Sequence, residues 1–269
     1  MAAPQKLSLA LSPSRAGDYQ QCPLLYRFRA IDRLPEPKTR AQVLGTLVHA
    51  VLEQMHGLPA QERTYPAAVK LIKPTWADLL SRDREELEGV IPPEETMDFF
   101  VEARELVKGY FRMENPTGFS AEECEKYVNT TLPNGVPVRG FIDRVDIAPG
   151  GQVRVVDYKT GKKPQPKYSD QARFQMKFYA LVWWRLTGTV PAQLRLMYLK
   201  VAQDLVLRPS PAELTYFERD LGELWSRILA DVESGDFRPR TSKLCGWCHF
   251  QEICPAFGGT PPEYPLLRG

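Results

Sequence analysis

Apolar residues in the first half of the chain recur at the spacing of helices. Val43, Leu47, Val48 and Val51, for example, repeat every three or four positions, which places them on one helix face. A serine followed by a proline at residues 12 and 13 is a start signal for an earlier helix. The pattern predicts helices over Leu11–Ala30, around Val43–Met55, over Tyr65–Glu88 and over Glu94–Met113. Residues 11–115 are therefore expected to form a helical N-terminal elaboration.

The pattern changes to strands near residue 120. The turn Pro133-Asn134-Gly135 between two apolar segments is typical of a hairpin. Five strands are predicted, over Glu125–Leu132, Val136–Ile147, Gln152–Tyr158, Gln193–Lys200 and Asp204–Leu207, with helices over Ser169–Leu186 and Ala212–Glu233. This order predicts an α/β fold in which a central mixed sheet is flanked by helices. Residues 120–234 would form its core, within one domain that spans residues 1–269.

Composition sets limits on the class of protein. The chain has 269 residues with 43% hydrophobic content, which is enough to bury one sizeable core. A formal net charge of +2 does not by itself indicate a nucleic-acid partner. No apolar run approaches the roughly 20 residues that span a bilayer, and the N-terminus lacks the apolar segment of a signal peptide. We therefore expect a cytoplasmic protein without a membrane partner, in which five cysteines are not explained by disulfides.

The predicted strands carry two acidic residues and a lysine that suit metal chemistry. Asp157 and Lys159 are two positions apart, so a strand directs both side chains to one face. Antiparallel pairing through the turn at residues 149–151 would bring Asp143 close to Asp157. Carboxylate oxygens suit magnesium and manganese, and an adjacent lysine can stabilise charge or help to activate a water molecule. The alternative is a pair of charged residues on a solvated hairpin.

These residues carry a resemblance to a known family. Gly140-x-Ile142-Asp143 followed by Asp157-x-Lys159 resembles the core of the PD-(D/E)XK nuclease superfamily. The stretch from Asp157 to Lys162, DYKTGK, is similar to its RecB-type branch. Two further segments, at residues 45–53 and 175–179, resemble the histidine-bearing helix and the glutamine–tyrosine signature of that branch. The resemblance extends from about residue 11 to residue 257.

The resemblance implies a role for each candidate residue. His49, Asp143, Asp157 and the carbonyl of Tyr158 would hold one or two Mg²⁺ or Mn²⁺ ions, while Lys159 would assist the attacking water. Gln175 and Tyr179, four residues apart on one helix face, would contact DNA or hold the lysine. Each helix residue also has a structural alternative. His49 could be a half-buried helix histidine, and Gln175 and Tyr179 could serve ordinary packing.

The cysteines form a second candidate site. Cys245, Cys248 and Cys254 are spaced as C-x₂-C-x₅-C, and Cys22 lies 223 positions before Cys245 (245 − 22). This set is similar to the iron–sulfur subset of RecB-type nucleases, which includes CRISPR-associated adaptation nucleases. The resemblance implies a [4Fe–4S] cluster that joins the first helix to a tail of residues 235–269. Zinc bound by the same cysteines, or by three of them with His249, remains the alternative from spacing alone. Cys124 fits neither set and is expected to be a small core residue.

Local clusters of basic and aromatic residues suggest contacts with nucleic acid. Six basic residues follow or belong to the third strand, against the single acidic Asp170: Lys159, Lys162, Lys163, Lys167, Arg173 and Lys177. A second basic patch is suggested by Arg15, Arg27, Arg29, Lys38 and Arg40. Bases could stack on Tyr19, Tyr26, Phe28 and Tyr168, although packing is the alternative for these rings.

Together these features predict a metal-dependent DNA exonuclease that acts on single-stranded ends in DNA repair or recombination. The exonuclease activity and the preference for single strands are implied by the resemblance. A nuclease of CRISPR spacer acquisition and a non-catalytic DNA-binding protein with the same fold are the alternatives. The sequence contains no G-x-x-x-x-G-K-[ST] phosphate loop, so unwinding would require a helicase or repair partner.

Overall fold

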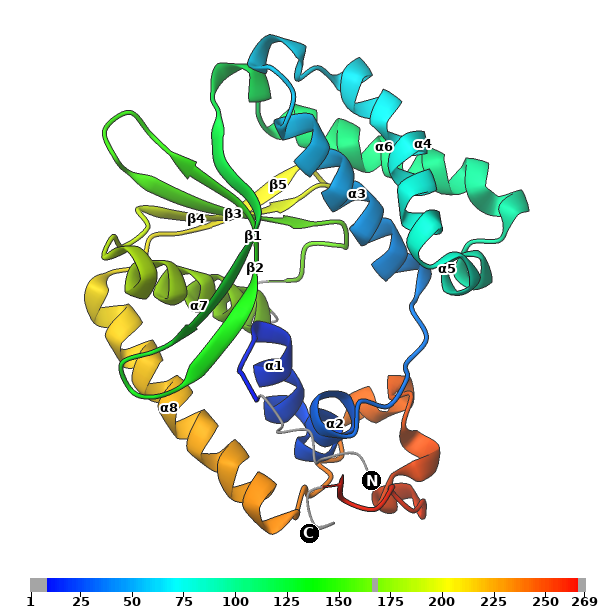
Figure 1. The fold of residues 1–269 in the computed structure, drawn as a ribbon, viewed down its shortest axis with the longest axis vertical. Helices are drawn as coiled ribbons and strands as arrows, with labels where there is room; N and C mark the ends of the chain where they lie inside the picture. The colour runs from blue at the N-terminus through cyan, green and yellow to red at the C-terminus, as the bar shows by residue number, and fades with distance from the viewer. Residues whose placement is uncertain (1–8, 166–168, 266–269) are drawn as a thin grey trace. The chain divides into compact units, whose positions relative to one another are not determined.

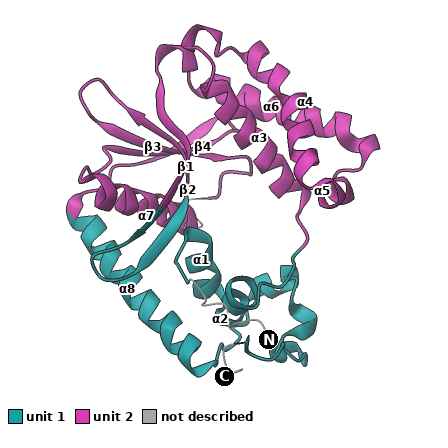
Figure 2. Ribbon diagram, in the orientation of Figure 1, with its two compact units in different colours: residues 1–36, 129–140, 212–269 teal, residues 37–128, 141–211 magenta. Residues whose placement is uncertain are grey.

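The computed structural model describes residues 9–165 and 169–265, so Lys167 and Tyr168 lie outside the described residues. The chain separates into two compact units (Figure 2). Unit 1 comprises residues 1–36, 129–140 and 212–269, and unit 2 comprises residues 37–128 and 141–211. The predicted division of one domain into elaboration, core and tail stays a prediction.

A five-stranded sheet forms the centre of the fold, in the order β1-β2-β3-β4-β5 (Figure 1). Its strands are β1 (Ala121–Thr131), β2 (Pro137–Ile147), β3 (Val153–Lys159), β4 (Gln193–Tyr198) and β5 (Gln203–Leu207). The β2–β3 and β4–β5 pairs are antiparallel, whereas β3 and β4 are parallel. This is the mixed sheet that the sequence predicted.

Helix α7 (Asp170–Thr187) provides the connection between β3 and β4. Parallel neighbours need such a crossover, because a tight turn cannot return the chain to the same end of the sheet. The helix ends at Gly188, whose φ of 74° is the left-handed conformation that favours glycine as a cap. Figure 1 shows α7 lying along the sheet. Its position fixes which side chains can reach the end of β3.

The remaining helices of unit 2 cover the other face of β3. They are α3 (Arg40–His56), α4 (Tyr65–Arg82), α5 (Arg84–Val90) and α6 (Thr96–Met113). Leu47, Trp76 and Phe99 join one buried cluster with Val156 and Tyr158 of β3. Since side chains alternate along a strand, the neighbours of Val156 and Tyr158 face away from this cluster, towards α7. The cluster therefore supports the strand that carries Asp157 and Lys159.

A buried arginine ties these elements together. Arg144 of β2 is fully buried and forms ion pairs with Glu114 and Asp146. It also donates a 2.7 Å hydrogen bond to the Tyr158 hydroxyl and a 3.0 Å hydrogen bond to His56 Nε2. A buried charge is tolerated only when it is paired in this way. The network anchors the Tyr158 side chain, and hence the end of β3.

Unit 1 contains α1 (Pro13–Gln21), α2 (Pro23–Tyr26), a π-helical turn (Arg27–Ile31) and α8 (Pro211–Ser234). The sequence predicted one helix over residues 11–30, and this is wrong at Cys22. The Cys22 backbone is extended, with φ −160° and ψ 115°. The cause is Pro23, because a proline disfavours the helical conformation of the residue before it. Cys22 therefore lies in a break between two helices.

Short 3₁₀ turns complete the described secondary structure. In unit 2 they are Ala60–Glu62, Pro93–Glu95 and Pro116–Gly118, and in unit 1 Lys243–Trp247, Gln251–Ile253 and Pro255–Phe257. Among the helices of the described ranges, none is long and apolar enough to cross a membrane.

The aromatic rings near the N-terminus pack inside unit 1. The Tyr19 hydroxyl donates a 2.7 Å hydrogen bond to Asp231, the Tyr26 ring stacks on Phe237, and the Phe28 ring contacts Phe250. Tyr19, Tyr26 and Phe28 are all buried. These three rings therefore follow the packing alternative rather than base stacking, because they join the N-terminal helices to α8 and to the C-terminal tail.

The second predicted basic patch is largely neutralised within the fold. Arg27 is buried and pairs with Asp32. Arg29, Lys38 and Arg40 each form ion pairs with two carboxylates. These side chains mainly serve the fold, so they carry little of the expected affinity for phosphates.

Candidate active site

Strands β2 and β3 place two carboxylates opposite each other. Arg144 pairs with Val156 in the antiparallel ladder, so Asp143 and Asp157 occupy the next opposed pair of positions. The turn that joins the strands contains Gly151, whose φ of 80° requires glycine. Asp157 is 2% exposed. The hairpin thus brings together the two acidic residues that the sequence singled out.

The backbone of Tyr158 connects the two strands to helix α3. Its N–H donates a 2.7 Å hydrogen bond to Asp143 Oδ2, and its carbonyl accepts a 3.0 Å hydrogen bond from His49 Nε2. His49 lies in the middle of α3, and the apolar face of this helix packs on β3. An imidazole, a carboxylate and a backbone carbonyl therefore converge at one point.

A third carboxylate joins this group. Ligand atoms of His49, Glu125 and Asp143 all lie within 4.8 Å of one another. The His49 Nδ1 is 3.5 Å from Asp143 Oδ2 and 3.7 Å from Glu125 Oε1. Carboxylate oxygens with one imidazole form a donor set that suits magnesium or manganese. The residues present therefore fit a hard divalent ion.

Glu125 was missed as a site residue by sequence reasoning. It belongs to β1 and carries no recognisable motif, yet its φ is 46°. Such a conformation is uncommon for a residue other than glycine and costs about 1–3 kcal/mol when it is not relieved. A local distortion of an edge strand can redirect a side chain towards a functional site. No feature of the sequence predicts this backbone conformation.

The electrostatics of the site reflect its crowded negative charge. Burial raises the pKa of Asp143, and the nearby Asp157 raises it further, to about 7. Burial alone would lower the pKa of His49, but Asp143, Glu125 and Asp157 outweigh it and raise that pKa to about 9. Both shifts show that the site favours a positive charge at its centre.

Lys159, Gln175 and Asp157 form a closed triangle of contacts. The Lys159 Nζ lies 2.7 Å from Asp157 Oδ2 and donates a 2.8 Å hydrogen bond to Gln175 Oε1. The Gln175 Nε2 donates a 2.7 Å hydrogen bond to Asp157 Oδ1. Of the two roles that the resemblance implied for Gln175, the geometry matches the one that holds the lysine.

Tyr179 lies one helical turn after Gln175 on α7. It is 7% exposed, and it shares a hydrogen bond with Gln175. Burial raises the pKa of its phenol, and the charges of Asp157 and Asp143 raise it further. Tyr179 is therefore a neutral hydroxyl that packs behind the amide of Gln175.

The basic stretch after β3 has mixed environments. The Lys163 Nζ donates hydrogen bonds to Gln203 and to the carbonyl of Asp204, and Arg173 donates to Ser169. Lys162 is exposed and Lys177 is half-buried. Because Lys159 pairs with Asp157, the exposed Lys162 is the clearer source of positive charge near the end of β3.

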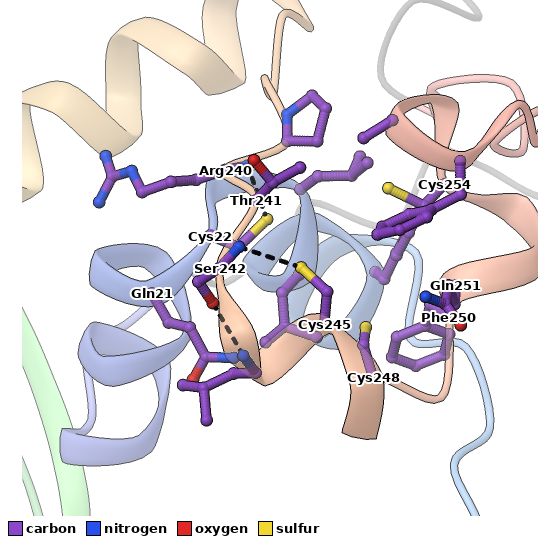
Figure 3. A pocket seen from close by; sticks show the side chains of 17 residues that line it. Gln21, Cys22, Arg240, Thr241, Ser242, Cys245, Cys248, Phe250, Gln251 and Cys254 are labelled. Carbon is purple, nitrogen blue, oxygen red and sulfur yellow. Dashed lines mark hydrogen bonds between the residues drawn. The ribbon is translucent and has the colours of Figure 1, made fainter.

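Four of the five cysteines gather in unit 1. Cys22, Cys245, Cys248 and Cys254 line one pocket (Figure 3). The backbone N–H of Arg240 donates to Cys22 Sγ and that of Ser242 donates to Cys245 Sγ, both at 3.3 Å. Cys124 belongs to unit 2 and does not line this pocket. Burial raises its pKa to about 11, as expected for an unreactive thiol.

The fold and the site define the class of protein. A mixed sheet whose central hairpin presents two carboxylates and a lysine, beside a helix-borne histidine, is the arrangement of a nuclease. Comparison with known proteins gives the family: the model of the PD-(D/E)XK nuclease superfamily matches residues 10–255, and the chain belongs to this superfamily.

The chain is also similar to individual relatives and to a solved structure. Gene 69 protein of Mycobacterium phage D29 is 26% identical over 274 residues, covering 91% of this chain and 96% of the relative. Gene 69 protein of Mycobacterium phage L5 is 31% identical over 127 residues, covering 46% of this chain and 41% of the relative. A structure named "Putative exonuclease" from Eubacterium rectale aligns with a TM-score of 0.60 at 13% identity, covering 100% of this chain and 98% of that one. At this identity the structural likeness concerns the fold alone.

Proposed function

We propose that this protein is a RecB-type nuclease that hydrolyses DNA phosphodiesters with the help of Mg²⁺ or Mn²⁺. The observation that carries the proposal is the convergence of His49, Asp143 and Asp157 with the Lys159–Gln175 pair at one end of β3. The buried cluster that contains Val156 and Tyr158 includes none of these polar groups, so packing within that cluster does not explain why they converge.

Five groups are assigned to hold the ion. They are the His49 imidazole, the carboxylates of Glu125, Asp143 and Asp157, and the carbonyl of Tyr158. A divalent ion bound there supplies Lewis acidity and neutralises charge on the phosphate. His49 hydrogen-bonds to the same carbonyl in the structure, so its ring needs to release that carbonyl for the set to act together.

The chain's own residues account for the remaining chemistry. In hydrolysis a water oxygen bonds to phosphorus, the bond to the sugar oxygen breaks, and that oxygen takes up a proton. Lys159 faces this position and stabilises the negative charge that develops on the phosphoryl oxygens, or orients the water. Gln175 holds the Lys159 ammonium and one oxygen of Asp157 in register, and Tyr179 supports Gln175. Groups that are held in place before the substrate binds lower the activation barrier, because they need no further ordering during the reaction.

The finer assignments extend the same proposal. We assign exonuclease action on single-stranded DNA ends, in repair or recombination in the cytoplasm, on the resemblance to RecB-type nucleases. A helicase partner would supply unwinding. A role in CRISPR spacer acquisition is the second candidate, because the cysteine pattern is similar to that of the adaptation nucleases. A non-catalytic DNA-binding role is disfavoured by the intact set of Asp143, Asp157 and Lys159.

We also propose that the four cysteines of unit 1 bind a [4Fe–4S] cluster. Zinc–sulfur bonds of about 2.3 Å would bring four thiolates to within about 4 Å of one another. In the described residues, no three cysteine sulfurs lie within 4.8 Å of one another. A cubane holds its thiolates farther apart, since iron and sulfide atoms lie between them. The backbone N–H donors to Cys22 and Cys245 suit thiolates that carry part of a cluster's charge.

A digestion assay tests the nuclease proposal. End-labelled single-stranded and double-stranded DNA, and RNA of the same sequence, are incubated with Mn²⁺, Mg²⁺ or EDTA. We expect DNA digestion that depends on the metal and is abolished by Asp157→Asn and by Lys159→Ala. Asp98→Asn, at an exposed position of α6, is the matched control and should digest normally. Full activity after chelation, or in either site variant, would refute the assignment.

A further inference from the structure

Two aromatic rings are exposed on neighbouring strands of unit 2. Tyr127 of β1 is 52% exposed and Phe141 of β2 is 53% exposed. Their ring centroids lie 5.0 Å apart with the ring planes tilted by 46°. They therefore form one contiguous aromatic surface rather than two isolated exposed residues.

This pair contributes little to the core. Four other apolar side chains of the same strands are at most 1% exposed: Val128, Val138, Ile142 and Val145. Leaving half of each large ring in water forgoes much of the hydrophobic stabilisation that its burial would give. Single exposed apolar residues need no explanation, but a paired aromatic surface indicates a binding surface.

The aromatic pair adjoins the candidate metal site. Phe141 is two positions before Asp143 on β2, and Tyr127 is two positions after Glu125 on β1. Residues two apart on a strand share a face and are separated by about 7 Å. Phe141 thus lies on the face of β2 that carries Asp143, at about the reach from a phosphate group to the base of the same nucleotide. The left-handed backbone of Glu125 interrupts the alternation along β1, so Tyr127 is placed beside this face by its ring contact with Phe141 instead.

We propose that Tyr127 and Phe141 form a stacking site for an unpaired nucleobase next to the phosphate that is cleaved. The two rings offer an apolar surface, and stacking on it accepts any base because every base has a π-face. A base inside a duplex is already stacked and paired, so it cannot present its face to these rings. The site therefore selects single-stranded substrate through the nucleotide adjacent to the metal.

This inference rests on the proposed nuclease function, and it names the substrate feature that the site recognises. The sequence suggests other rings for stacking, of which Tyr19, Tyr26 and Phe28 are buried. Tyr127 and Phe141 replace them as the stacking residues, because they combine exposure with a position beside the acidic groups.

Fluorescence of 2-aminopurine tests the stacking site. The probe is a short oligothymidylate with phosphorothioate linkages that resist cleavage, carrying one 2-aminopurine that is moved stepwise from the end. Full-length wild-type protein should quench the fluorescence strongly at one position. Tyr127→Leu and Phe141→Leu should abolish that quenching and weaken binding about tenfold. Tyr216→Leu, which removes a ring that is 62% exposed on α8, is the matched control and should bind like wild type.

Two further measurements distinguish base stacking from other causes of weaker binding. An oligomer with an abasic residue at the quenched position should bind wild type and both leucine variants equally. Tyr127→Phe and Phe141→Tyr keep the rings and should retain quenching, which separates stacking from loss of fold. Unchanged quenching and affinity in both leucine variants would overturn the proposal. So would a dimer of wild-type protein that both variants dissociate, because the rings would then contact a second copy.

The nuclease assay is read separately from the stacking assay. Digestion by wild type together with unchanged binding in the leucine variants rejects the stacking site alone. Absence of digestion together with ring-dependent quenching rejects the nuclease function alone. Absence of both digestion and binding rejects both.

Discussion

The Nζ of Lys159 donates a 2.8 Å hydrogen bond to Oε1 of Gln175, which comes from the helix that follows β3. The other end of the same amide donates to Asp157, so one neutral side chain fixes both a cation and an anion. An amide suits this task because it offers a donor and an acceptor at once. Gln175 is therefore a positioning residue for the two charged groups.

Gln175→Leu should lower kcat by about 10- to 100-fold with little change in KM, since supporting partners of ligands typically contribute this much. Steady-state digestion of a labelled oligonucleotide measures both constants. Gln171→Leu, one turn earlier on the same helix and exposed, should behave like wild type. A large rise in KM at unchanged kcat would show instead that Gln175 binds the nucleic acid directly.

Glu125→Gln should weaken Mn²⁺ binding by about tenfold, because the affinity of a site for a hard cation follows the number of charged oxygen ligands. The signal of free Mn²⁺ in electron paramagnetic resonance reports binding without any need for activity. Glu122→Gln, which alters an exposed carboxylate of the same strand, is the control. Equal affinity in Glu125→Gln and wild type would remove Glu125 from the ligand set.

The hairpin of the candidate site could be predicted because its signal is local. The two-residue spacing of Asp157 and Lys159 and the turn at residues 149–151 define a face and a pairing without any knowledge of distant segments. Glu125 could not be predicted in the same way. Its place in the site depends on a backbone conformation with φ of 46°, which the surrounding fold imposes. Strand periodicity carries no information about such a distortion.

Burial was the other property that the sequence did not determine. Tyr19, Tyr26 and Phe28 belong to a segment rich in arginine, which suggested an exposed surface for nucleic acid. In the structure these rings pack on residues that follow position 230, more than 200 positions away. Contacts over such separations arise from the tertiary fold, and local patterns do not reveal them.

Stability should fall in mild acid because of His56. Burial lowers the pKa of His56 to about 3, and Arg144 contributes in the same direction. The unfolded state takes up a proton below its pKa of 6.5, while the folded state resists it until about pH 3. The free energy of unfolding therefore decreases as pH falls from 6.5 towards 3, by about 2 kcal/mol at about pH 5.

Urea unfolding of wild type and His56→Gln at about pH 7.5 and about pH 5 measures this contribution. Glutamine retains an acceptor for the Tyr110 hydroxyl but does not titrate. The difference in unfolding free energy between the two pH values should be smaller in the variant. An identical pH dependence in both proteins would show that His56 does not titrate as described.

Helix α6 approaches the end of β4 too closely for any side chain at Gly109. A Cβ there would lie 1.9 Å from the carbonyl oxygen of Leu199, a backbone atom that cannot move aside alone. Gly109→Ala should destabilise the protein by about 1–3 kcal/mol. Gly89→Ala, in helix α5, meets nothing within 4 Å and should raise stability by about 0.5–1 kcal/mol. Urea unfolding measures the free energy of unfolding of both variants. A change in the same direction in both, relative to wild type, would contradict this argument.

The cysteine site gives the final prediction, which separates an iron–sulfur cluster from zinc. Protein purified without oxygen should be brown and contain about four irons per chain. Cys22→Ala should lose this iron as completely as Cys248→Ala, despite the 223 positions between Cys22 and Cys245 (245 − 22), because all four cysteines line one pocket. Cys124→Ala should retain it, since Cys124 lies in the other unit. Iron analysis and visible absorbance measure these outcomes, and a colourless protein with stoichiometric zinc would reject the cluster.

Loss of the cluster should also loosen unit 1, because binding and folding are coupled where a site joins distant segments. Cys22 lies in the break between α1 and α2, where its backbone is extended although its N–H still donates to the Asp18 carbonyl. Without the cluster, the N-terminal helices keep the Tyr26–Phe237 and Phe28–Phe250 ring contacts with the tail but lose the link through the cysteines. We expect faster proteolysis near both chain ends in Cys22→Ala than in Cys124→Ala. Equal protection of the two variants, with iron lost from only one, would show that the cluster binds without stabilising the fold.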